Sequence, residues 1–428
     1  MNIRALFRIL YVIFSYLLLP LIFFHLVYKG YGDRDYFKRI GERFGFNGDP
    51  LTESIIWVHA VSYGEVKAAS ILITELKRKY PEKKILITTY TPTGSSLVTE
   101  LFGDDVYHVY LPYDLADSMI RFFKWAQPEI LIIIETELWP NLFHYCGQFN
   151  VPLVLASACV SDRSIKLYKI LLGLFQEAVA HGIVVGAQTE EDAKKFLLMG
   201  SDEARTFVTG NIKFDYHIPE NLTDRANLFK ESLTSSRPIW VAGSTHSKEE
   251  EVILDAHRGI LNHYPDLLLI IAPRRPERFN AVGNLITKKG FSSMKRSEQA
   301  KMNLDNVQVL LADVLGELPI FYSVSNVSFI GGSLFHVGGH NLLEPASLNC
   351  PVITGPVLFG VEDIANMFLA NDALKIIHNS DELSDLVSSL LSDDKMRLSM
   401  IKGASNVIEA NKGSLEKLLK MIEPLLES

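Results

Sequence analysis

Two runs of short apolar segments, each segment followed by a stretch with helical periodicity, restrict this chain to one class of fold. Strand-like segments of the first run lie at Ile55–His59, Ile85–Thr89, Val106–Leu111, Ile130–Glu135, Val151–Ser157 and Ile183–Gln188. Those of the second run lie at Ile239–Gly243, Leu267–Ala272, Val307–Leu311, Val327–Ile330, Val352–Thr354 and Leu374–Ile377. Strands that alternate with helices form parallel sheets covered by helices on both faces. We therefore predict an α/β protein with two Rossmann-like domains.

The stretches between these strands have the spacing of amphipathic helices. In the first run they begin near Glu65, Gly94, Leu115, Trp139, Arg163 and Thr189. In the second run they begin near Lys248, Pro276, Glu317, Asn341 and Asp363, and a helical tail follows from about Asp381. The polar segment Thr209–Ser236 interrupts the alternation and is interpreted as a linker region. Because ligands of open α/β sheets bind beyond the carboxyl ends of the strands, a cleft between two such domains would collect both sets of loops.

The N-terminal segment differs from the rest of the chain. Ile9–Tyr28 contains no Asp, Glu, Lys or Arg, and about 20 apolar residues can cross a bilayer as a helix. Pro20 and His25 leave open a kinked or shallow insertion into one leaflet. More basic residues follow this run than precede it, and positive charge stays cytoplasmic. We therefore predict an N-terminal membrane anchor over residues 1–30, with the body of the protein in the cytoplasm.

Composition and missing motifs exclude several classes of protein. A formal net charge of −8 argues against a general nucleic-acid binder. No Gly-x-Gly-x-x-Gly follows the first strand and no Walker A pattern occurs, which disfavours NAD, FAD and P-loop chemistry. Cys146, Cys159 and Cys350 have neither metal-ligand nor disulfide spacing, which indicates a reducing compartment. No His/Cys/carboxylate cluster has metal-ligand spacing, so no metal site is predicted.

Polar residues follow the predicted strands of the first run where a ligand would lie. Glu65 opens the helix after the first strand, and such an acid can also serve only as a partner of the helix dipole. Glu135 ends the fully apolar strand Ile130–Ile134, with Glu137 two residues further on. A carboxylate in that position is costly unless it is partnered or used, so Glu135 is the stronger candidate of the two. Lys213 lies between apolar residues in the linker region, and a surface lysine remains an equal alternative.

The second run offers a candidate nucleotide pocket. Its central stretch, Gly331–Pro356, turns through two glycine pairs into a helix expected to begin at Asn341, with Glu344 at the capping-box position. A glycine-rich turn before a helix N-terminus suits an anion, although such glycines and caps often serve the fold alone. Three arginines, Arg274, Arg275 and Arg278, follow a buried strand, and their guanidinium groups suit phosphate or carboxylate. Another strand-to-helix turn contains Gly316 and Glu317.

Taken together, these motifs resemble one family, the Kdo transferases, where Kdo is 3-deoxy-D-manno-octulosonic acid. The matching motifs, in order, are GERFGF (41–46), SYGE (62–65), TPTG (91–94), LPYD (111–114), ETELWPN (135–141), GNIKFD (210–215), PRRPERF (273–279) and GGHNLLEP (338–345). The resemblance covers essentially the whole chain. It implies a membrane-anchored, inverting glycosyltransferase of the GT-B type. Such enzymes move Kdo from CMP-Kdo to the tetra-acylated lipid A precursor (lipid IVA) in lipopolysaccharide synthesis, at the cytoplasmic face of the bacterial inner membrane.

The resemblance also implies roles for particular residues. Glu65 corresponds to the general base, and Glu135 and Lys213 to the residues that assist the transition state. The CMP contacts correspond to Pro273, Arg274, Leu315, Gly316, Glu317, Asn341, Leu342, Leu343 and Glu344. No metal or other cofactor is expected, and nucleic acid is not an expected partner. Tyr63 and Asn211 depart from the family's usual residues, and Tyr63 could alter how the acceptor fits.

The expected organisation is a membrane anchor (1–30), an acceptor-side domain (31–212) and a CMP-sugar donor domain (213–428) whose C-terminal helix could pack back on the first. Two alternatives stay open. A nucleotide-sugar epimerase would need neither a lipid acceptor nor an anchor, and the apolar run argues against it. A membrane-tethered nucleotide-binding scaffold would need no catalytic residues, and the presence of Glu65, Glu135 and Lys213 together argues against that.

Overall fold

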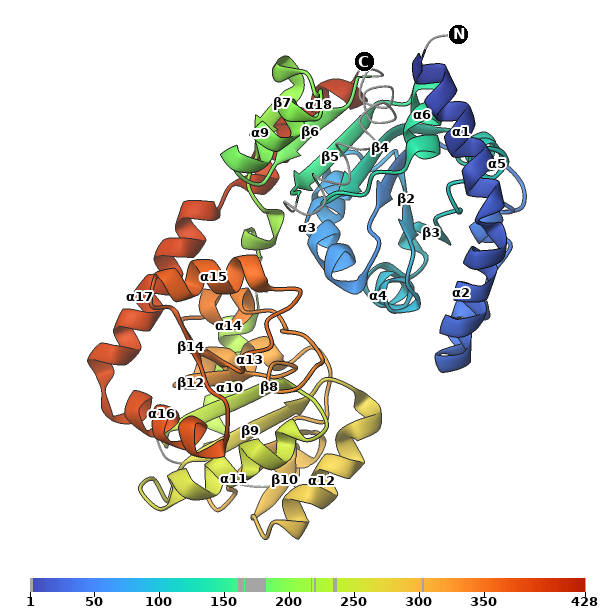
Figure 1. The fold of residues 1–428 in the computed structure, drawn as a ribbon. Coiled ribbons are helices and arrows are strands. Elements are labelled where there is room, and N and C mark those ends of the chain that lie inside the picture. Colours follow the sequence, from blue (N-terminus) through green and yellow to red (C-terminus); the bar gives the residue numbers. More distant parts are fainter. Residues whose placement is uncertain are drawn as a thin grey trace. The chain divides into compact units, whose positions relative to one another are not determined.

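The computed structural model describes residues 3–160, 165, 182–216, 218, 221–233, 237–301 and 304–427. It divides the chain into two compact units, which are Met1–Asp215 with Asn411–Ser428, and Tyr216–Ala410. Each unit contains one parallel sheet of seven strands with helices around it (Figure 1). The predicted fold class, an α/β protein with two parallel-sheet domains, is confirmed.

The first sheet has the strand order β3-β2-β1-β4-β5-β6-β7. Its strands are β1 (Ile55–His59), β2 (Lys84–Thr89), β3 (Tyr107–Tyr110), β4 (Pro128–Ile134), β5 (Leu153–Ala158), β6 (Val184–Ala187) and β7 (Thr206–Val208). The helices around it are α3 (Tyr63–Lys79), α4 (Pro92–Phe102), α5 (Ala116–Ala126), α6 (Pro140–Gln148), α9 (Glu190–Leu198) and α18 (Ser414–Leu426). The helix expected near Arg163 lies outside the described residues.

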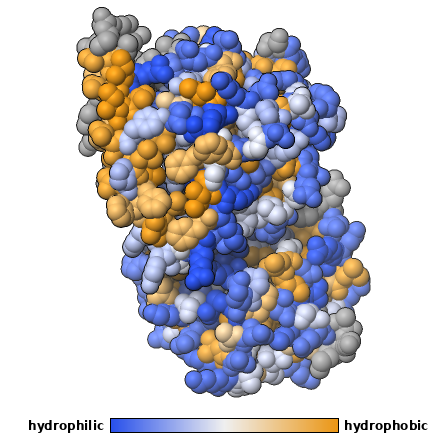
Figure 2. Space-filling model, turned by 90° about the vertical axis from the view of Figure 1, so that its right-hand side faces the viewer, coloured by the Kyte–Doolittle hydropathy of each residue, from blue (hydrophilic) through white to orange (hydrophobic). Residues whose placement is uncertain are grey.

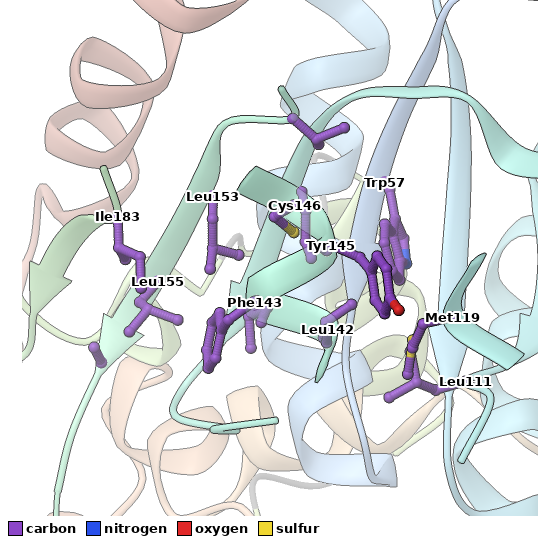
Figure 3. Close-up of a cluster of buried hydrophobic side chains, with 14 of the residues drawn as sticks. Trp57, Leu111, Met119, Leu142, Phe143, Tyr145, Cys146, Leu153, Leu155 and Ile183 are labelled. Carbon is purple, nitrogen blue, oxygen red and sulfur yellow. The ribbon is translucent and has the colours of Figure 1, made fainter. Parts of the chain in front are cut away.

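Both faces of this sheet are buried, which explains why its strands have almost continuous apolar sequences. One face carries a core formed with α5, α6 and α9, part of which is shown in Figure 3. In this core the centroid of the Trp57 ring lies 4.7 Å from that of Phe122. The other face packs against α3, α4 and α18. Helix α18 thus belongs to the first unit although it is last in the chain. The Asp215 carboxylate holds its start by accepting hydrogen bonds from the backbone N–H groups of Gly413 (2.7 Å) and Leu415 (2.6 Å).

The second sheet has the order β10-β11-β9-β8-β12-β13-β14. Its strands are β8 (Ile239–Thr245), β9 (Leu268–Pro273), β10 (Ser293–Lys295), β11 (Val309–Leu311), β12 (Val327–Ile330), β13 (Val352–Thr354) and β14 (Leu374–Ile376). Its helices are α10 (Leu222–Glu231), α11 (Glu249–Leu261), α12 (Phe279–Lys288), α13 (Leu318–Val324), α14 (Leu343–Ser347), α15 (Glu362–Ala370), α16 (Ser380–Ser392) and α17 (Asp394–Asn411). A buried core forms between this sheet and α11, α12 and α16.

The boundary between the two units, at Asp215 and Tyr216, lies within the region interpreted as a linker, Thr209–Ser236, and that region also contains regular structure. A short 3-10 turn, Ile212–Phe214, is followed by the ten-residue helix α10. Leu222, Ala226 and Phe229 form the buried face of α10, and Phe229 meets Phe321 of α13 with ring centroids 5.5 Å apart. This helix is part of the second unit's core.

The N-terminal apolar run forms two helices, α1 (Ile3–Leu17) and α2 (Leu19–Gly32), with a break at Leu18. Pro20 lies in the first turn of α2, where its missing N–H is tolerated, so a new helix begins there more readily than the old one continues. Within the described residues no single helix is long and apolar enough to cross a membrane. The pair Leu6–Leu17 and Leu19–Gly32, bent by 46°, meets that requirement jointly, by length and composition alone. One continuous helix over 9–28 is therefore wrong, and the kinked arrangement is found.

Candidate functional site

The chain reverses its direction of winding in the first sheet between β1 and β4, which lie side by side although β2 and β3 separate them in sequence. Ligands of parallel sheets bind at the carboxyl ends of strands next to such a switch point. Glu65 lies in the first turn of α3, directly after β1, and Glu135 follows the last residue of β4. Both predicted catalytic carboxylates therefore lie at this edge.

Glu65 is half-buried and held within its own turn. Its Oε2 accepts a hydrogen bond from the Val61 N–H (2.5 Å), and its Oε1 accepts one from the Ser62 hydroxyl (3.2 Å). Burial and, to a smaller extent, the charges of Glu135 and Glu137 raise the pKa of Glu65 to about 7, against the opposing effect of the two hydrogen bonds. A carboxyl group with a pKa near neutrality can accept a proton at ordinary pH.

Glu135 pairs with Lys213, whose Nζ lies 2.5 Å from the Glu135 Oε1. The two side chains keep only 26% and 29% of their exposure. Lys213 lies between Ile212 and Phe214, both fully buried, which fix the short turn that carries it. Burial lowers the pKa of Lys213, but the attraction and hydrogen bond of Glu135 outweigh it, so the net shift is upward and the amine stays protonated. The structure thus brings the three predicted catalytic residues together.

The backbone of Glu135 has a φ of +61°, which is uncommon for a residue other than glycine. Such a conformation persists where the surroundings hold it in place, and it is frequent at functional sites. Here the Glu135 N–H donates to the Ala156 carbonyl (2.9 Å) of the neighbouring strand β5. The left-handed backbone directs the chain out of the sheet immediately after its apolar strand, and the carboxylate meets Lys213.

Glu137 also belongs to this site, although no role was predicted for it. Burial raises its pKa to about 6, with a smaller contribution from Glu135, and the Trp139 side chain opposes the rise. The sequence shows two glutamates in one loop, but it does not reveal that both are half-buried beside Glu65. The missing information is burial, which depends on how the loops pack.

In the second unit the switch point lies between β8 and β12, and a buried glutamate organises the loops there. Glu249 is 0% exposed and accepts hydrogen bonds from four backbone N–H groups. Three of these belong to the turn after β12, at Gly332 (2.7 Å), Ser333 (3.0 Å) and Leu334 (3.0 Å), and the fourth to His246 after β8 (3.0 Å). This carboxylate therefore fixes the start of the glycine-rich stretch.

Two glycines of that stretch are required by geometry. Gly332 (φ +76°) and Gly338 (φ +111°) have left-handed backbones. A Cβ on Gly332 would lie 2.4 Å from the Gly338 carbonyl oxygen, and 2.9 Å from the His340 ring. His340 and His246 stack with centroids 5.1 Å apart and join through their Nε2 atoms at 2.8 Å. The glycines thus make room for a histidine pair in which His246 was not anticipated from the sequence.

The helix after the glycine pairs begins later than expected. Helix α14 starts at Leu343 and has only five residues, and Leu342 is its N-cap residue in place of Asn341, whose side chain accepts from the Leu343 N–H (3.1 Å). Glu344 accepts a hydrogen bond from the Tyr216 hydroxyl (3.2 Å) instead of completing a capping box with Asn341. The side chains of Leu342 and Leu343 are buried, so a ligand here would meet their backbone atoms. A five-residue helix also contributes less dipole than the sequence suggested.

The arginine loop after β9 divides its side chains between two tasks. Arg278 forms a two-pronged pair with the buried Glu250 (3.2 and 3.0 Å), so it serves the fold. Arg274 is half-buried, and it lies with Arg275 close enough to His246 to add to the lowering of the pKa of that histidine, which burial begins. Pro273 is buried at the end of β9. Positive charge and the histidine pair therefore occupy one edge of the second sheet.

The turn before α13 contains the remaining predicted contacts. Leu315 is 64% exposed and Gly316 has a φ of +75°. The Glu317 carboxylate already pairs with Arg225 (3.1 Å) and Arg296 (2.6 Å). A ligand at this turn would thus meet the backbone more easily than that carboxylate. Within the described residues, no group of three or more His, Cys, Asp or Glu side chains could hold a metal ion.

Comparisons with known proteins agree with this architecture. Residues 38–216 match the family model described as 3-deoxy-D-manno-octulosonic-acid transferase (kdotransferase), and residues 236–407 match glycosyl transferases group 1. The 3-deoxy-D-manno-octulosonic acid transferase of Haemophilus influenzae is 39% identical over 92% of this chain and 92% of its own length. That of Rickettsia bellii is 30% identical over 96% and 98%.

Solved structures with a similar fold include UDP-GlcNAc 2-epimerase from Neisseria meningitidis, with 12% identity and a TM-score of 0.56 over 86% of this chain and 100% of that one. A glycosyltransferase from Rickettsia africae has 16% identity and a TM-score of 0.50, over 88% and 100%. At such identities the likeness shows the fold alone. Two parallel-sheet units with polar loops at their switch points define a GT-B type glycosyltransferase architecture.

The identity to the Haemophilus influenzae enzyme over nearly the whole length of both chains decides the family. This chain belongs to the 3-deoxy-D-manno-octulosonic acid (Kdo) transferase family. The resemblance inferred from the motifs is confirmed. The epimerase alternative is supported by fold likeness only, whereas the transferase is supported by sequence.

We predict that Glu249→Gln loosens the glycine-rich stretch, because an amide cannot accept hydrogen bonds from all four N–H groups. The loss should be about 1–3 kcal/mol, the usual cost of unsatisfied buried donors. Hydrogen exchange of residues 331–344 measures it. Glu251→Gln on the same helix, at an exposed position, is the matched control. Equal exchange in the two variants would show that Glu249 does not hold this stretch.

Proposed function

We propose that this protein transfers Kdo from CMP-Kdo to the tetra-acylated lipid A precursor (lipid IVA), with inversion at the anomeric carbon and with Glu65 as the general base. One observation carries the proposal. Glu65 is a half-buried carboxylate with a pKa raised to about 7, at the switch point and beside the Glu135–Lys213 pair. The family membership gives the sugar, and the chemistry of the residues gives the mechanism.

In the proposed reaction, Glu65 takes the proton from a hydroxyl of the lipid's glucosamine as its oxygen attacks the anomeric carbon of Kdo. The bond between that carbon and the CMP phosphate oxygen breaks, and CMP leaves with the electron pair. Attack from the face opposite CMP inverts the configuration. A proton acceptor positioned in this way typically contributes 10²–10⁴-fold to the rate, as an order of magnitude.

Glu135 and Lys213 are proposed to assist the transition state. Protonated Lys213 pairs with Glu135 and places positive charge beside the reacting groups. Preorganised charge of this kind stabilises a transition state without reorganisation during the reaction. The pair also keeps a fixed negative charge near Glu65, which maintains the basicity of that carboxylate.

CMP-Kdo is proposed to bind to the second unit, at Pro273, Arg274, Leu315–Glu317 and Asn341–Glu344. Arg274 would oppose the charge of the leaving phosphate, and the backbones at Gly316 and Leu342–Leu343 would meet the nucleotide. A CMP-sugar has a single phosphate, so we propose that these groups take up its charge without a metal ion. Glu344 is proposed to accept hydrogen bonds from the ribose hydroxyls.

The protein is further proposed to act at the cytoplasmic face of the bacterial inner membrane. Side chains exposed on α1 and α2 are largely apolar, and Figure 2, which looks onto the side of the molecule that carries these helices, shows apolar residues gathered there. Lys29 in the last turn of α2, with Arg34 and Lys38 after that helix, suits an anionic lipid surface. These features support an acceptor that reaches the enzyme from the membrane.

The direct test incubates the protein with CMP-Kdo and the tetra-acylated precursor and measures product mass. We expect Kdo addition by the wild type and a loss of roughly 10²-fold or more in rate with Glu65→Gln, which keeps the shape but cannot take a proton. Glu82→Gln, at an exposed position in the same unit, is the control. A wild type that adds no Kdo, or a fully active Glu65→Gln, would disprove the proposal, and the latter would favour another base.

The pH profile provides a second prediction. Because the pKa of Glu65 is raised to about 7, its basic form is lost as pH falls through that value. We expect kcat/KM for the lipid to level off above pH 7 and to fall about tenfold per unit below it. Glu137→Gln removes a charge that raises the pKa of Glu65, so the falling limb should move to lower pH. A profile that is flat across this range, or unmoved in Glu137→Gln, contradicts the assignment.

The donor site is tested separately. Glu344→Ala should raise the KM for CMP-Kdo by roughly 10- to 100-fold, the worth of hydrogen bonds to a charged group, and should change the KM for the lipid far less. Tyr216→Phe is the matched control, because it removes the hydroxyl that donates to Glu344 and leaves the carboxylate in place. If both variants raise the donor KM equally, Glu344 acts through Tyr216 and not on the ribose.

A further inference from the structure

The first unit contains an apolar pocket that the proposed chemistry does not use. Its volume is about 310 Å³, and it is lined by Leu19, Pro20, Ile22, Phe23, Phe24 and Leu26 of α2 together with Phe44 and Tyr113. Phe44 belongs to the GERFGF motif and Tyr113 to the LPYD motif. The proposed mechanism uses neither motif, whereas the pocket is lined by one residue from each of them.

Helix α1, which directly precedes the pocket-lining helix α2, is hydrogen-bonded to the body of the unit. The Tyr11 hydroxyl donates to the Asp114 carboxylate (2.8 Å), and the Tyr16 hydroxyl donates to Asp117. The same Asp114 carboxylate accepts from the N–H groups of Asn141 (2.9 Å) and Leu142 (2.8 Å) at the start of α6. One buried carboxylate thus connects α1 to the start of α6, after the loop that carries Glu135 and Glu137.

The pocket is continuous with an exposed apolar surface. Phe23 and Phe24 line it and are still 60% and 68% exposed. Further exposed apolar side chains of these helices are Leu6, Phe7, Ile9, Leu10, Ile13, Phe14, Leu17, Leu21 and Val27. Exposed apolar surface on this scale marks an interaction site, and on an amphipathic N-terminal segment it suits a lipid surface. A hydrocarbon chain could therefore enter the pocket from a membrane without crossing water.

A row of aromatic rings connects the pocket with the candidate catalytic site. The Phe44 ring lies 5.4 Å from Tyr113, Tyr113 lies 6.2 Å from Tyr90, and Tyr90 stacks on Trp139 at 6.5 Å. Trp139 is close enough to Glu137 to affect its pKa, and Glu137 in turn affects that of Glu65. A series of neighbouring side chains therefore runs from the pocket to the proposed base.

Arg43, the arginine of the GERFGF motif, holds two rings of this row in place. It is 1% exposed, its guanidinium lies 5.4 Å from the Tyr90 ring centroid, and its Nη2 donates to the Tyr90 carbonyl (3.1 Å). Its own carbonyl accepts from the Tyr113 N–H (2.8 Å). A buried arginine is costly unless its environment uses it, and here it sets the positions of two of the rings.

We propose that this pocket holds one acyl chain of the acceptor lipid and thereby positions the sugar headgroup at Glu65. The inference rests on the proposed function, because the acceptor there is an acylated disaccharide. A chain that moves from a bilayer into the pocket exchanges one apolar environment for another, so little affinity is gained. The pocket instead orients the reacting hydroxyl, and this orientation raises the reaction rate more than it raises the affinity for the lipid.

The test fills the pocket and compares two acceptors. Ile22→Trp places a large ring in the pocket, and Leu21→Trp, its neighbour outside the lining and 63% exposed, is the matched control. For the tetra-acylated precursor in detergent, Ile22→Trp should lower kcat/KM about tenfold, the order expected when a reacting group is misplaced. For the fully deacylated disaccharide, kcat/KM should be unchanged, as should the KM for CMP-Kdo. Leu21→Trp keeps the exposed surface apolar and leaves the pocket open, so it should change none of these values.

Photocrosslinking locates the chain directly in the wild-type protein, so it does not depend on the folding of a variant. A tetra-acylated precursor with a diazirine on an acyl chain should label peptides that contain residues 19–26, 44 or 113, and unlabelled precursor should suppress this. A phospholipid with the same diazirine should label these peptides less. Equal labelling by the phospholipid, without competition from the precursor, would make the pocket a seat for membrane lipid and overturn the inference.

The two proposals fail in different ways. If the wild type adds no Kdo to either acceptor, the proposed function fails. If the wild type adds Kdo but Ile22→Trp and Leu21→Trp have the same ratio of rates on the acylated and deacylated acceptors, the acyl pocket fails and the transferase proposal stands.

Discussion

The candidate catalytic site depends on the ion pair between Lys213 and Glu135. Three carboxylates, those of Glu65, Glu135 and Glu137, gather at the switch point of the first sheet, and like charges in a half-buried place repel one another. Lys213 offsets the charge of one of them at 2.5 Å. Burial and the charge of Glu135 still raise the pKa of both Glu65 and Glu137, and burial is the larger cause for each.

The second unit uses a buried carboxylate in a different way. Glu249 faces backbone donors instead of a cation, and its four hydrogen bonds convert a glycine-rich segment into a defined loop. Glycine residues allow the turns of Gly331–Pro356, but they also allow many other backbone conformations and do not select one of them. Glu249, at the start of α11 after the neighbouring strand β8, selects the conformation of this loop through its hydrogen bonds. A loop held in this way can present backbone N–H groups and the histidine pair to a ligand without rearranging first.

Much of this arrangement could be read from the sequence, and the exceptions have physical reasons. The buried strands were predictable because their apolar runs are continuous. Strands β7 and β10 were not, since only one of their six side chains, that of Met294, is buried, which leaves no apolar run to recognise. Helix α10 does carry a buried face at Leu222, Ala226 and Phe229, and its polar surroundings concealed that signal.

For the site, the sequence indicated Glu65, Glu135 and Lys213 as residue types in suitable loops. It did not reveal the ion pair, the role of Glu137 or the contact between His246 and His340. Each of these joins residues by packing, and the two histidines are 94 positions apart. Burial and long-range contact are properties of the folded chain, so a motif can name a residue without giving its environment.

The motifs also contain carboxylates whose work is structural, and their hydrogen bonds distinguish them from the proposed base. Asp114 and Asp215 each bind backbone N–H groups far away in the sequence, at the starts of α6 and α18. A proton on either would loosen the attachment of a whole helix. The partners of Glu65, Val61 and Ser62, are within four residues of it. A proton on Glu65 therefore disturbs one turn, and a carboxylate with that freedom can change protonation in each catalytic cycle while the fold stays intact.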